Sequence, residues 1–228
     1  MGIQEKRRIV RLLESSDIDA VIEELRQLPA TKVINPLIGA LCSCNETVRW
    51  HAITALGPVM ADLAEQDMEA ARVVMRRFMW SLNDESGGIG WGVPEAMGEV
   101  LSCHDGLARE YIHILVAYMR EDGFYLELEQ LQRGLMWGLA RLAQVKPELL
   151  RARNAAVHLL PYLDSSDASV RGLAAWGLGL LQAQEAIPGL RDLVSDTSRV
   201  TYFHDRALVT DTVGGLAEKA LANISKAS

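Results

Sequence analysis

The chain has 228 residues, of which 49% are hydrophobic and 23% are charged, and its formal net charge is −7 at pH 7. This composition is ordinary for a globular protein with a buried core. The negative charge argues against a nucleic-acid partner, because nucleic-acid binding depends on basic residues that neutralise phosphates. No stretch approaches the roughly 20 apolar residues that cross a bilayer, so we expect no membrane partner.

Residues 1–30 are expected to form N-terminal helices. The segment MGIQEKRRIVRLLESS has the pattern of an amphipathic helix and lacks the apolar core of a signal peptide. The chain has three cysteines, too few for a disulfide framework. Together these features predict a cytoplasmic protein.

From residue 33 onward the sequence repeats with a period of about forty residues. Five segments end in small residues at positions 57, 98, 140, 179 and 222, so the intervals are 41, 42, 39 and 43 residues. An apolar segment and a polar turn precede each of them, which predicts pairs of helices. Asn45 and either Ser166 or Asp167 are expected to cap second helices. The predicted repeats of this single domain, 1–228, are 33–64, 67–104, 106–145, 148–183 and 185–225.

The repeats contain the pattern D-x-x-VR-x-x-A-x-x-x-LG, clearest in DASVRGLAAWGLG and partial in NETVRWHAITALG. In this the sequence resembles the HEAT-like repeat proteins, particularly the bacterial group related to phycobilin lyases, over residues 33–224. The resemblance implies an all-α, right-handed α-solenoid of about five helix pairs. Such motifs indicate a fold and leave the activity open.

The second aligned segment lies in DESGGIGWGVPEAMGEVL, residues 84–101, where glycines and Pro94 replace the first turn of a helix. Pro94 is tolerated within a first turn, which predicts a loop over residues 86–92 and a helix that starts near Gly90 or Trp91. The glycines either provide left-handed turn geometry and close packing, or expose backbone N–H groups to an anion.

Residues 199–213, RVTYFHDRALVTDTV, alternate and are rich in β-branched and aromatic side chains. This pattern predicts a small β-hairpin near residues 199–210, with its turn at His204 to Arg206 and the last helix starting near Asp211. We expect the hairpin to cover part of the terminal repeat as a cap.

The resemblance implies that the second helix of each repeat lines a concave surface. The alignment places tryptophans and charged residues in adjacent rows on that surface, one helical turn apart. Such a groove suits a peptide with an aromatic anchor or a planar or cationic ligand. Alternatively, the tryptophans fill the seams between helices, and Glu95–Arg133 and Glu99–Arg141 form ion pairs. The predicted binding residues are Trp50, Trp91, Glu95, Arg133, Trp137, Arg141 and Trp176.

We expect a non-enzymatic protein-binding or scaffold module that holds a protein or peptide in the concave groove, without a cofactor. The alternative is an enzyme or small-ligand binder at the Trp/Glu/Arg face. Trp91, Glu95, Arg133 and Trp176 loosely resemble the site of HEAT-like DNA glycosylases, although the acidic chain opposes that activity, and the bilin-lyase relatives imply a tetrapyrrole.

We expect no metal site. Cys42 and Cys44 lie in a turn within a repeat, whereas Cys103 and His104 lie between repeats, which places them on opposite edges of a solenoid. The His-Glu pairs of iron-binding HEAT-like enzymes are absent from the sequence. The pattern leaves the oligomeric state open.

Overall fold

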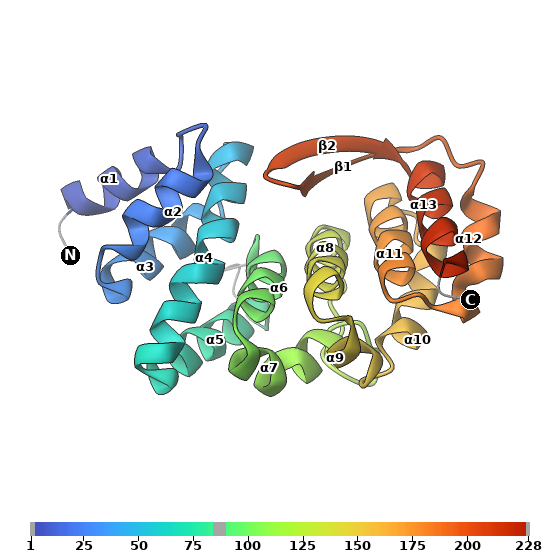
Figure 1. Cartoon of the computed structure of the whole chain (residues 1–228), viewed down its shortest axis with the longest axis horizontal. Coiled ribbons are helices and arrows are strands. Elements are labelled where there is room, and N and C mark those ends of the chain that lie inside the picture. Colours follow the sequence, from blue (N-terminus) through green and yellow to red (C-terminus); the bar gives the residue numbers. More distant parts are fainter. Residues whose placement is uncertain (1–2, 84–89, 227–228) are drawn as a thin grey trace. The chain divides into compact units, whose positions relative to one another are not determined.

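The computed structural model describes residues 3–83 and 90–226 (Figure 1). Within them the chain forms five consecutive pairs of helices, as the repeat predicts, and one two-stranded sheet. The pairs are α3 (Ala30–Ala40) with α4 (Glu46–Gln66), α5 (Met68–Leu82) with α6 (Val93–Cys103), α7 (Asp105–Ala117) with α8 (Glu129–Val145), α10 (Ala155–Leu159) and the 3-10 helix η1 (Leu160–Asp164) with α11 (Ala168–Leu180), and α12 (Ile187–Leu193) with α13 (Val213–Ser225). The other helices are α1 (Ile3–Leu12), α2 (Ile18–Arg26), α9 (Pro147–Arg151) and the 3-10 helix η2 (Gln184–Ala186).

Contacts between Cα atoms divide the chain into two compact units, Met1–Ala108 and Arg109–Ser228, and the division falls within α7. In the first unit α4 packs against α2, α3, α5 and α6. In the second, α11 packs against α8, α13 and η1. Within each unit, the second helix of a repeat therefore contacts the second helix of the next one, as a stacked repeat requires.

These central helices are buried on more than one face, because they have neighbours on several sides. In α4 the side chains of Ala52, Ile53 and Leu56 are all fully buried. Small residues permit the close approach: a Cβ added at Gly179 of α11 would clash with the Cα atom of Ala220 in α13. Gly179, which ends its aligned segment, is thus a contact point between α11 and α13.

The two predicted capping positions are confirmed. The side chain of Asn45 accepts a hydrogen bond from the backbone N–H of Val48 at 3.3 Å, at the start of α4. Asp167 accepts one from the N–H of Val170 at 3.0 Å, at the start of α11. Each cap satisfies an N–H group that has no partner within its own helix.

Part of the glycine-rich loop predicted over residues 86–92 lies outside the described residues, and only Gly90, Trp91 and Gly92 can be placed. Helix α6 begins at Val93, two to three residues later than the sequence predicts. The reason is Gly92, which caps the helix in the left-handed conformation with φ of 74°. A Cβ at this position would lie 3.0 Å from the carbonyl oxygen of Leu41. Turn geometry and close packing therefore explain this glycine.

The predicted hairpin is present as β1 (Arg199–His204) and β2 (Ala207–Thr212), which pair antiparallel with Arg199 opposite Thr212. The turn residues Asp205 and Arg206 have φ values of 48° and 67°, as in the tight turns that match the twist of a hairpin. Helix α13 begins at Val213 rather than near Asp211, because β2 extends to Thr212 and the Thr212 side chain caps the helix.

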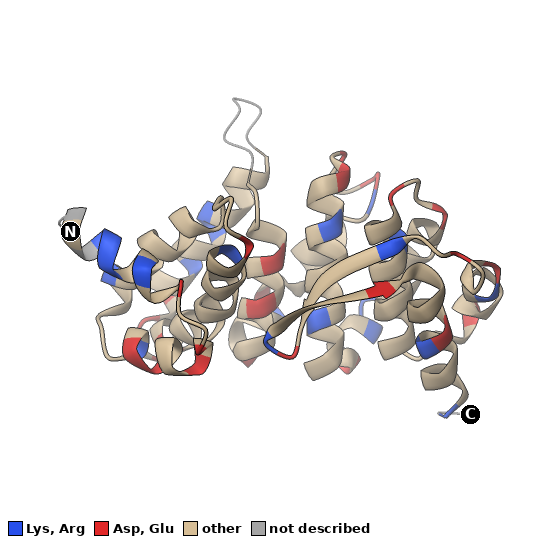
Figure 2. Ribbon diagram, turned by 90° about the horizontal axis from the view of Figure 1, so that it is seen from above, with Lys and Arg blue, Asp and Glu red and all other residues tan. Residues whose placement is uncertain are grey.

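Charge is unevenly distributed along the chain (Figure 2). Helix α1 carries Lys6, Arg7, Arg8 and Arg11, and Arg8 forms an ion pair with Glu24 of α2 at 2.6 Å. Among the described residues, no helix combines the length and the apolarity that crossing a membrane requires.

Candidate functional site

The seven predicted binding residues are divided between the two units. Trp50, Trp91 and Glu95 belong to the first, on α4 and at the start of α6. The other four belong to the second, on α8 and α11: Arg133, Trp137, Arg141 and Trp176. That these seven residues line one groove stays a prediction, because the groove would include residues of both units. The ion pairs Glu95–Arg133 and Glu99–Arg141 stay predictions for the same reason.

The four candidate tryptophans differ in their exposure to solvent. Trp50, Trp137 and Trp176 are 7%, 4% and 9% exposed, whereas Trp91 is partly exposed, just before α6 begins. Buried tryptophan rings fill space between elements, and only a ring with free surface can contact a ligand without rearrangement. Trp91 is therefore the strongest aromatic candidate for a binding contact.

Glu95 lies one helical turn after Trp91, in the first turn of α6. A small part of its side chain reaches the surface, but its carboxyl group is surrounded by protein. Burial raises the pKa of Glu95 from its ordinary value of 4.5 to about 7, although its own backbone N–H and the charge of Arg49 act in the opposite direction. Near neutral pH this carboxyl is present in both its protonated and its charged form.

Arg49 of α4 supplies the positive charge near Glu95. One of its terminal nitrogens, Nη2, binds Glu46 at 3.2 Å. Its Nε atom is buried and has no hydrogen-bond partner among the described residues. The α4–α6 surface thus combines an accessible ring, an acid that titrates near neutrality and a guanidinium group.

Trp137 and Trp176 lie beneath the hairpin. The indole N–H of Trp137 donates a hydrogen bond to the carbonyl oxygen of Phe203 at 2.7 Å. The ring of Trp176 lies 5.1 Å from that of Tyr202 and 5.4 Å from that of His204. The aromatic face of the hairpin therefore covers the second helices α8 and α11, and Asp211 of β2 also binds Lys219 of α13 in the last repeat at 2.6 Å.

Arg133 connects two neighbouring repeats. Its Nε atom binds Oδ2 of Asp167 at 2.9 Å, and its Nη2 atom binds the same oxygen. Burial alone would raise the pKa of Asp167, but Arg133 and the N–H groups of Val170 and Ser169 outweigh it, and the pKa lies below its ordinary value. Asp167 thus caps α11 and anchors Arg133 at once. Arg141, two turns further along α8, is partly exposed.

The motif arginine of the next repeat plays the same part. Arg171 binds Asp196 at 2.8 Å and donates to the carbonyl oxygens of Ser165 and Ser166. Both arginines lie near the start of a second helix and bind an aspartate in the turn of the following repeat. This connection between repeats explains the arginine at positions 133 and 171, whereas Arg49, at the same position of the first aligned segment, binds Glu46 of its own helix.

Cysteine and histidine side chains are dispersed. Cys42, Cys44 and Cys103 are exposed and form no disulfide within the described residues, and His104 binds Glu65 at 3.1 Å. Within residues 3–83 and 90–226 no group of three or more His, Cys, Asp or Glu side chains has the arrangement of a metal site.

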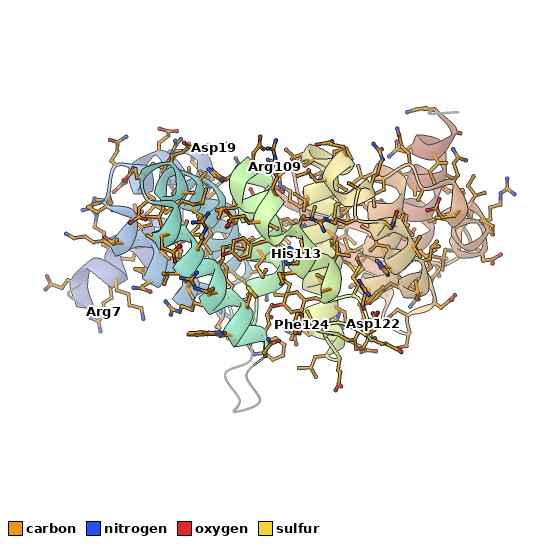
Figure 3. The ribbon with its side chains drawn as sticks, turned by 90° about the horizontal axis from the view of Figure 1, so that it is seen from below. Arg7, Asp19, Arg109, His113, Asp122 and Phe124 are labelled. Carbon is orange, nitrogen blue, oxygen red and sulfur yellow. The ribbon has the colours of Figure 1, made fainter. Side chains whose placement is uncertain are left out.

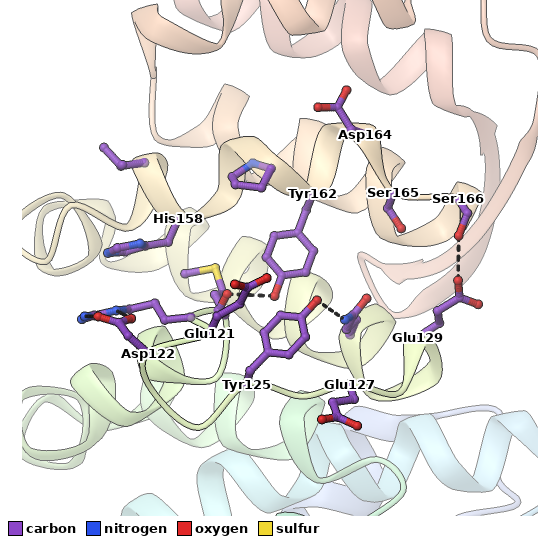
Figure 4. A pocket seen from close by; sticks show the side chains of 15 residues that line it. Glu121, Asp122, Tyr125, Glu127, Glu129, His158, Tyr162, Asp164, Ser165 and Ser166 are labelled. Atoms are coloured by element: carbon purple, nitrogen blue, oxygen red, sulfur yellow. Dashed lines mark hydrogen bonds and ion pairs between the residues drawn. The ribbon is translucent and has the colours of Figure 1, made fainter.

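A second candidate site in the Arg109–Ser228 unit is absent from the sequence predictions. A cavity of about 630 Å³ lies between the segment that joins α7 to α8 and the segment from α10 to α11 (Figure 4). The first segment, REDGFYLELE, combines acidic and aromatic residues, and this combination is the feature of the sequence that indicates a site here. The repeat pattern alone predicts only a polar turn there. Figure 3 shows Asp122 and Phe124 of this segment, beyond the end of α7.

No family model and no curated protein sequence matches the chain. Solved structures do. An engineered protein superimposes with a TM-score of 0.54 at 20% identity over 99% of this chain and 98% of its own. Armadillo repeat proteins designed for modular peptide recognition give 0.51 at 18% identity over 95% and 98%. A designed armadillo repeat protein in complex with the peptide (KR)4 gives 0.53 at 18% identity over the same shares. The fold is a helical-repeat solenoid. At such low identity these similarities establish the fold alone.

Proposed function

We propose that this protein is a non-enzymatic binding or scaffold module that holds a peptide or a segment of another protein on its second helices. The observation that carries the proposal is the pairing of Trp91 with Glu95 at the start of α6. Trp91 is accessible and Glu95 is a desolvated carboxyl one turn away, so one side chain can provide apolar contact and the other a directional hydrogen bond.

The structural neighbours support the same class of function. One of them was designed for peptide recognition, and another is in complex with a peptide. Helical solenoids commonly bind partners on a continuous surface. Arg133, Arg141 and the buried tryptophans Trp50, Trp137 and Trp176 then support the surface, with Arg133 held by Asp167.

The repeats are best described as HEAT-like, because each consists of two helices at intervals of 39 to 43 residues. We assign the protein to the cytoplasm on the basis of its few cysteines. These assignments extend the repeat pattern and do not depend on the binding proposal.

The experiment compares a double variant, Trp91→Ala with Glu95→Gln, with the unmodified protein as bait for a cross-linked partner identified by mass spectrometry. We expect the double variant to lose the partner while its thermal unfolding at pH 5 changes little, because Trp91 is partly exposed and Glu95 is protonated in the folded state at that pH. The control is Trp137→Ala, which removes a buried ring and its hydrogen bond and should cost about 3–5 kcal/mol of stability. Retention of the partner by the stable double variant would refute this use of α6.

The second candidate is an enzyme or small-ligand binder, DNA glycosylase-like or bilin lyase-like, at Trp91, Glu95 and Arg133. The pKa of Glu95 near 7 favours it, since an acid–base catalyst works best when its pKa lies near the working pH. The ion pair with Asp167 opposes it, because it engages Arg133. Release of alkylated purines from DNA, with a rate that follows the titration of Glu95 and disappears in Glu95→Gln, would favour the enzyme.

A further inference from the structure

The cavity in the Arg109–Ser228 unit has a rigid aromatic floor (Figure 4). Tyr162 of η1 is buried, and its hydroxyl donates to the carbonyl oxygen of Met119 at 3.1 Å. Tyr125 is 39% exposed, and its hydroxyl accepts from Nε2 of Gln132 at 3.1 Å. Figure 4 shows the two rings projecting toward each other from different segments. Both rings are therefore held in place in the absence of a ligand.

The rim of the cavity is acidic. Glu121, Glu127 and Asp164 line it, and none of them has an ion-pair partner in the part of the chain that the structure describes. Arg120 does not compensate them, because it binds both carboxylate oxygens of Asp122 at 2.9 and 2.6 Å. His158 is the other basic side chain of the lining.

A further carboxylate and an unused acceptor complete the lining. Glu129 accepts a hydrogen bond from the Ser166 hydroxyl at 2.8 Å, opposite the end of the cavity where Glu121 and Asp122 lie (Figure 4). Gln132 is 6% exposed, and its amide nitrogen donates to Tyr125 and, at 2.8 Å, to the carbonyl oxygen of Leu126. Its amide oxygen has no hydrogen-bond partner among the described residues. Gln132 lines the cavity, so this oxygen is an available acceptor for a ligand that brings an N–H donor.

We propose that this cavity binds an arginine side chain of a basic peptide segment. A guanidinium group is planar, stacks on aromatic rings and carries five N–H donors, so it satisfies the tyrosines, the carboxylates and the Gln132 oxygen together. The volume of about 630 Å³ lies within the range of ligand sites and exceeds the needs of one side chain.

The distribution of charge favours a peptide over a small free cation. Carboxylates lie at both ends of the cavity, Glu121 at one and Glu129 at the other, so an extended segment with more than one positive charge meets a complementary group at each end. This site belongs wholly to the Arg109–Ser228 unit and does not rest on the function proposed for α6.

The test uses the full-length protein and two fluorescein-labelled peptides, acetyl-Gly-Arg-Gly-Arg-Gly-amide and its twin with citrulline in place of arginine. Citrulline keeps the shape of arginine and removes its charge. Fluorescence anisotropy gives the dissociation constants. We expect the arginine peptide to bind, and the citrulline peptide to bind at least about tenfold more weakly.

The site variant is Glu121→Gln, Glu127→Gln and Asp164→Asn, and the control is Glu14→Gln, Glu185→Gln and Glu218→Gln. Both variants remove three negative charges, and all six residues are exposed, so both should fold like the unmodified protein. We expect the site variant to raise the dissociation constant at least about tenfold and the control at most about twofold.

A separate variant, Tyr125→Leu, leaves every charge in place and should weaken binding by about threefold or more through loss of the aromatic face. Equal weakening by the site and control variants would show general electrostatic attraction and overturn the proposal. Displacement of the peptide by spermidine at concentrations below the dissociation constant of the peptide would also overturn it, in favour of a small polyamine. The two proposals can fail separately. If the Trp91→Ala, Glu95→Gln variant loses its protein partner, we still expect it to bind the arginine peptide as the unmodified protein does.

Discussion

At the scale of single residues, Glu95 is a carboxyl group whose pKa is strongly raised by burial. The first turn of a helix normally favours a charged carboxylate, because backbone N–H groups and the helix dipole stabilise it. At Glu95 the loss of hydration outweighs this effect and the charge of Arg49, so the pKa rises to about 7. The folded protein therefore binds a proton at a pH where the unfolded chain has released it.

This difference predicts that stability falls as the pH rises from about 4.5 to about 7, because the folded state holds more protons than the unfolded state over that window. The shift of about 2.5 pKa units corresponds to at most about 3 kcal/mol, and partial exposure reduces it. We expect Glu95→Gln to remove this component and to be more stable than the unmodified protein at pH 8. Urea unfolding at pH 5 and pH 8 measures both quantities.

The matched control is Glu148→Gln, because Glu148 also follows a proline in the first turn of a helix but is exposed. We expect its pH dependence to match that of the unmodified protein. A Glu95→Gln variant whose stability changes with pH as the unmodified protein does would show that the carboxyl is fully hydrated.

At the scale of elements, the conformation of one residue decides where α6 begins. Gly92 has a positive φ that other residues adopt only with strain, and its Cα faces the backbone of Leu41. Gly39 provides a contrast: it lies within α3, and an added Cβ there would make only ordinary contact with Lys6, at 3.7 Å.

The same substitution should therefore have opposite effects at the two glycines. Gly92→Ala is expected to destabilise the fold by about 2 kcal/mol, through backbone strain and the crowded Leu41 carbonyl. Gly39→Ala is expected to stabilise it by about 0.5 kcal/mol, because alanine restricts the unfolded chain and favours the helix. Chemical denaturation of both variants tests this, and equal effects at the two positions would contradict the assigned conformation of Gly92.

At the scale of the whole molecule, a stack of repeats is stabilised by each repeat and by its contacts with the next. Leu56 is fully buried in α4, and Leu56→Ala should cost about 2–5 kcal/mol in the Met1–Ala108 unit. Hydrogen exchange measured by mass spectrometry should then be accelerated relative to the unmodified protein, and the acceleration should be larger in α2 to α6 than in α11 to α13.

The control is Leu208→Ala in the exposed part of the hairpin, which should leave exchange in the helices unchanged. If Leu56→Ala accelerated exchange equally in every helix, the chain would unfold as one cooperative unit. The outcome thus measures how strongly the repeats depend on one another.

The candidate site was predictable only in part. The amino-acid pattern placed Trp91 and Glu95 one turn apart, because helical spacing depends on neighbours in the chain. Nothing in that pattern showed that burial would shift the pKa of Glu95, since the shift arises from the packing around it. The acidic and aromatic segment around Tyr125 was visible, but the cavity exists only where residues 119–132 meet residues 157–166.

The sequence by itself determined the helix pairs, the cap at Asn45 and the hairpin turn near Asp205, and it placed the cap of α11 at Ser166 or Asp167, because backbone geometry and side chains a few residues away control these features. Only the tertiary structure decided that the hairpin lies over Trp137 and Trp176 and that Arg133 binds Asp167. These contacts join residues 66, 26 and 34 positions apart, as the positions 137 and 203, 176 and 202, and 133 and 167 show. Such distances depend on how the repeats stack, which no local pattern encodes.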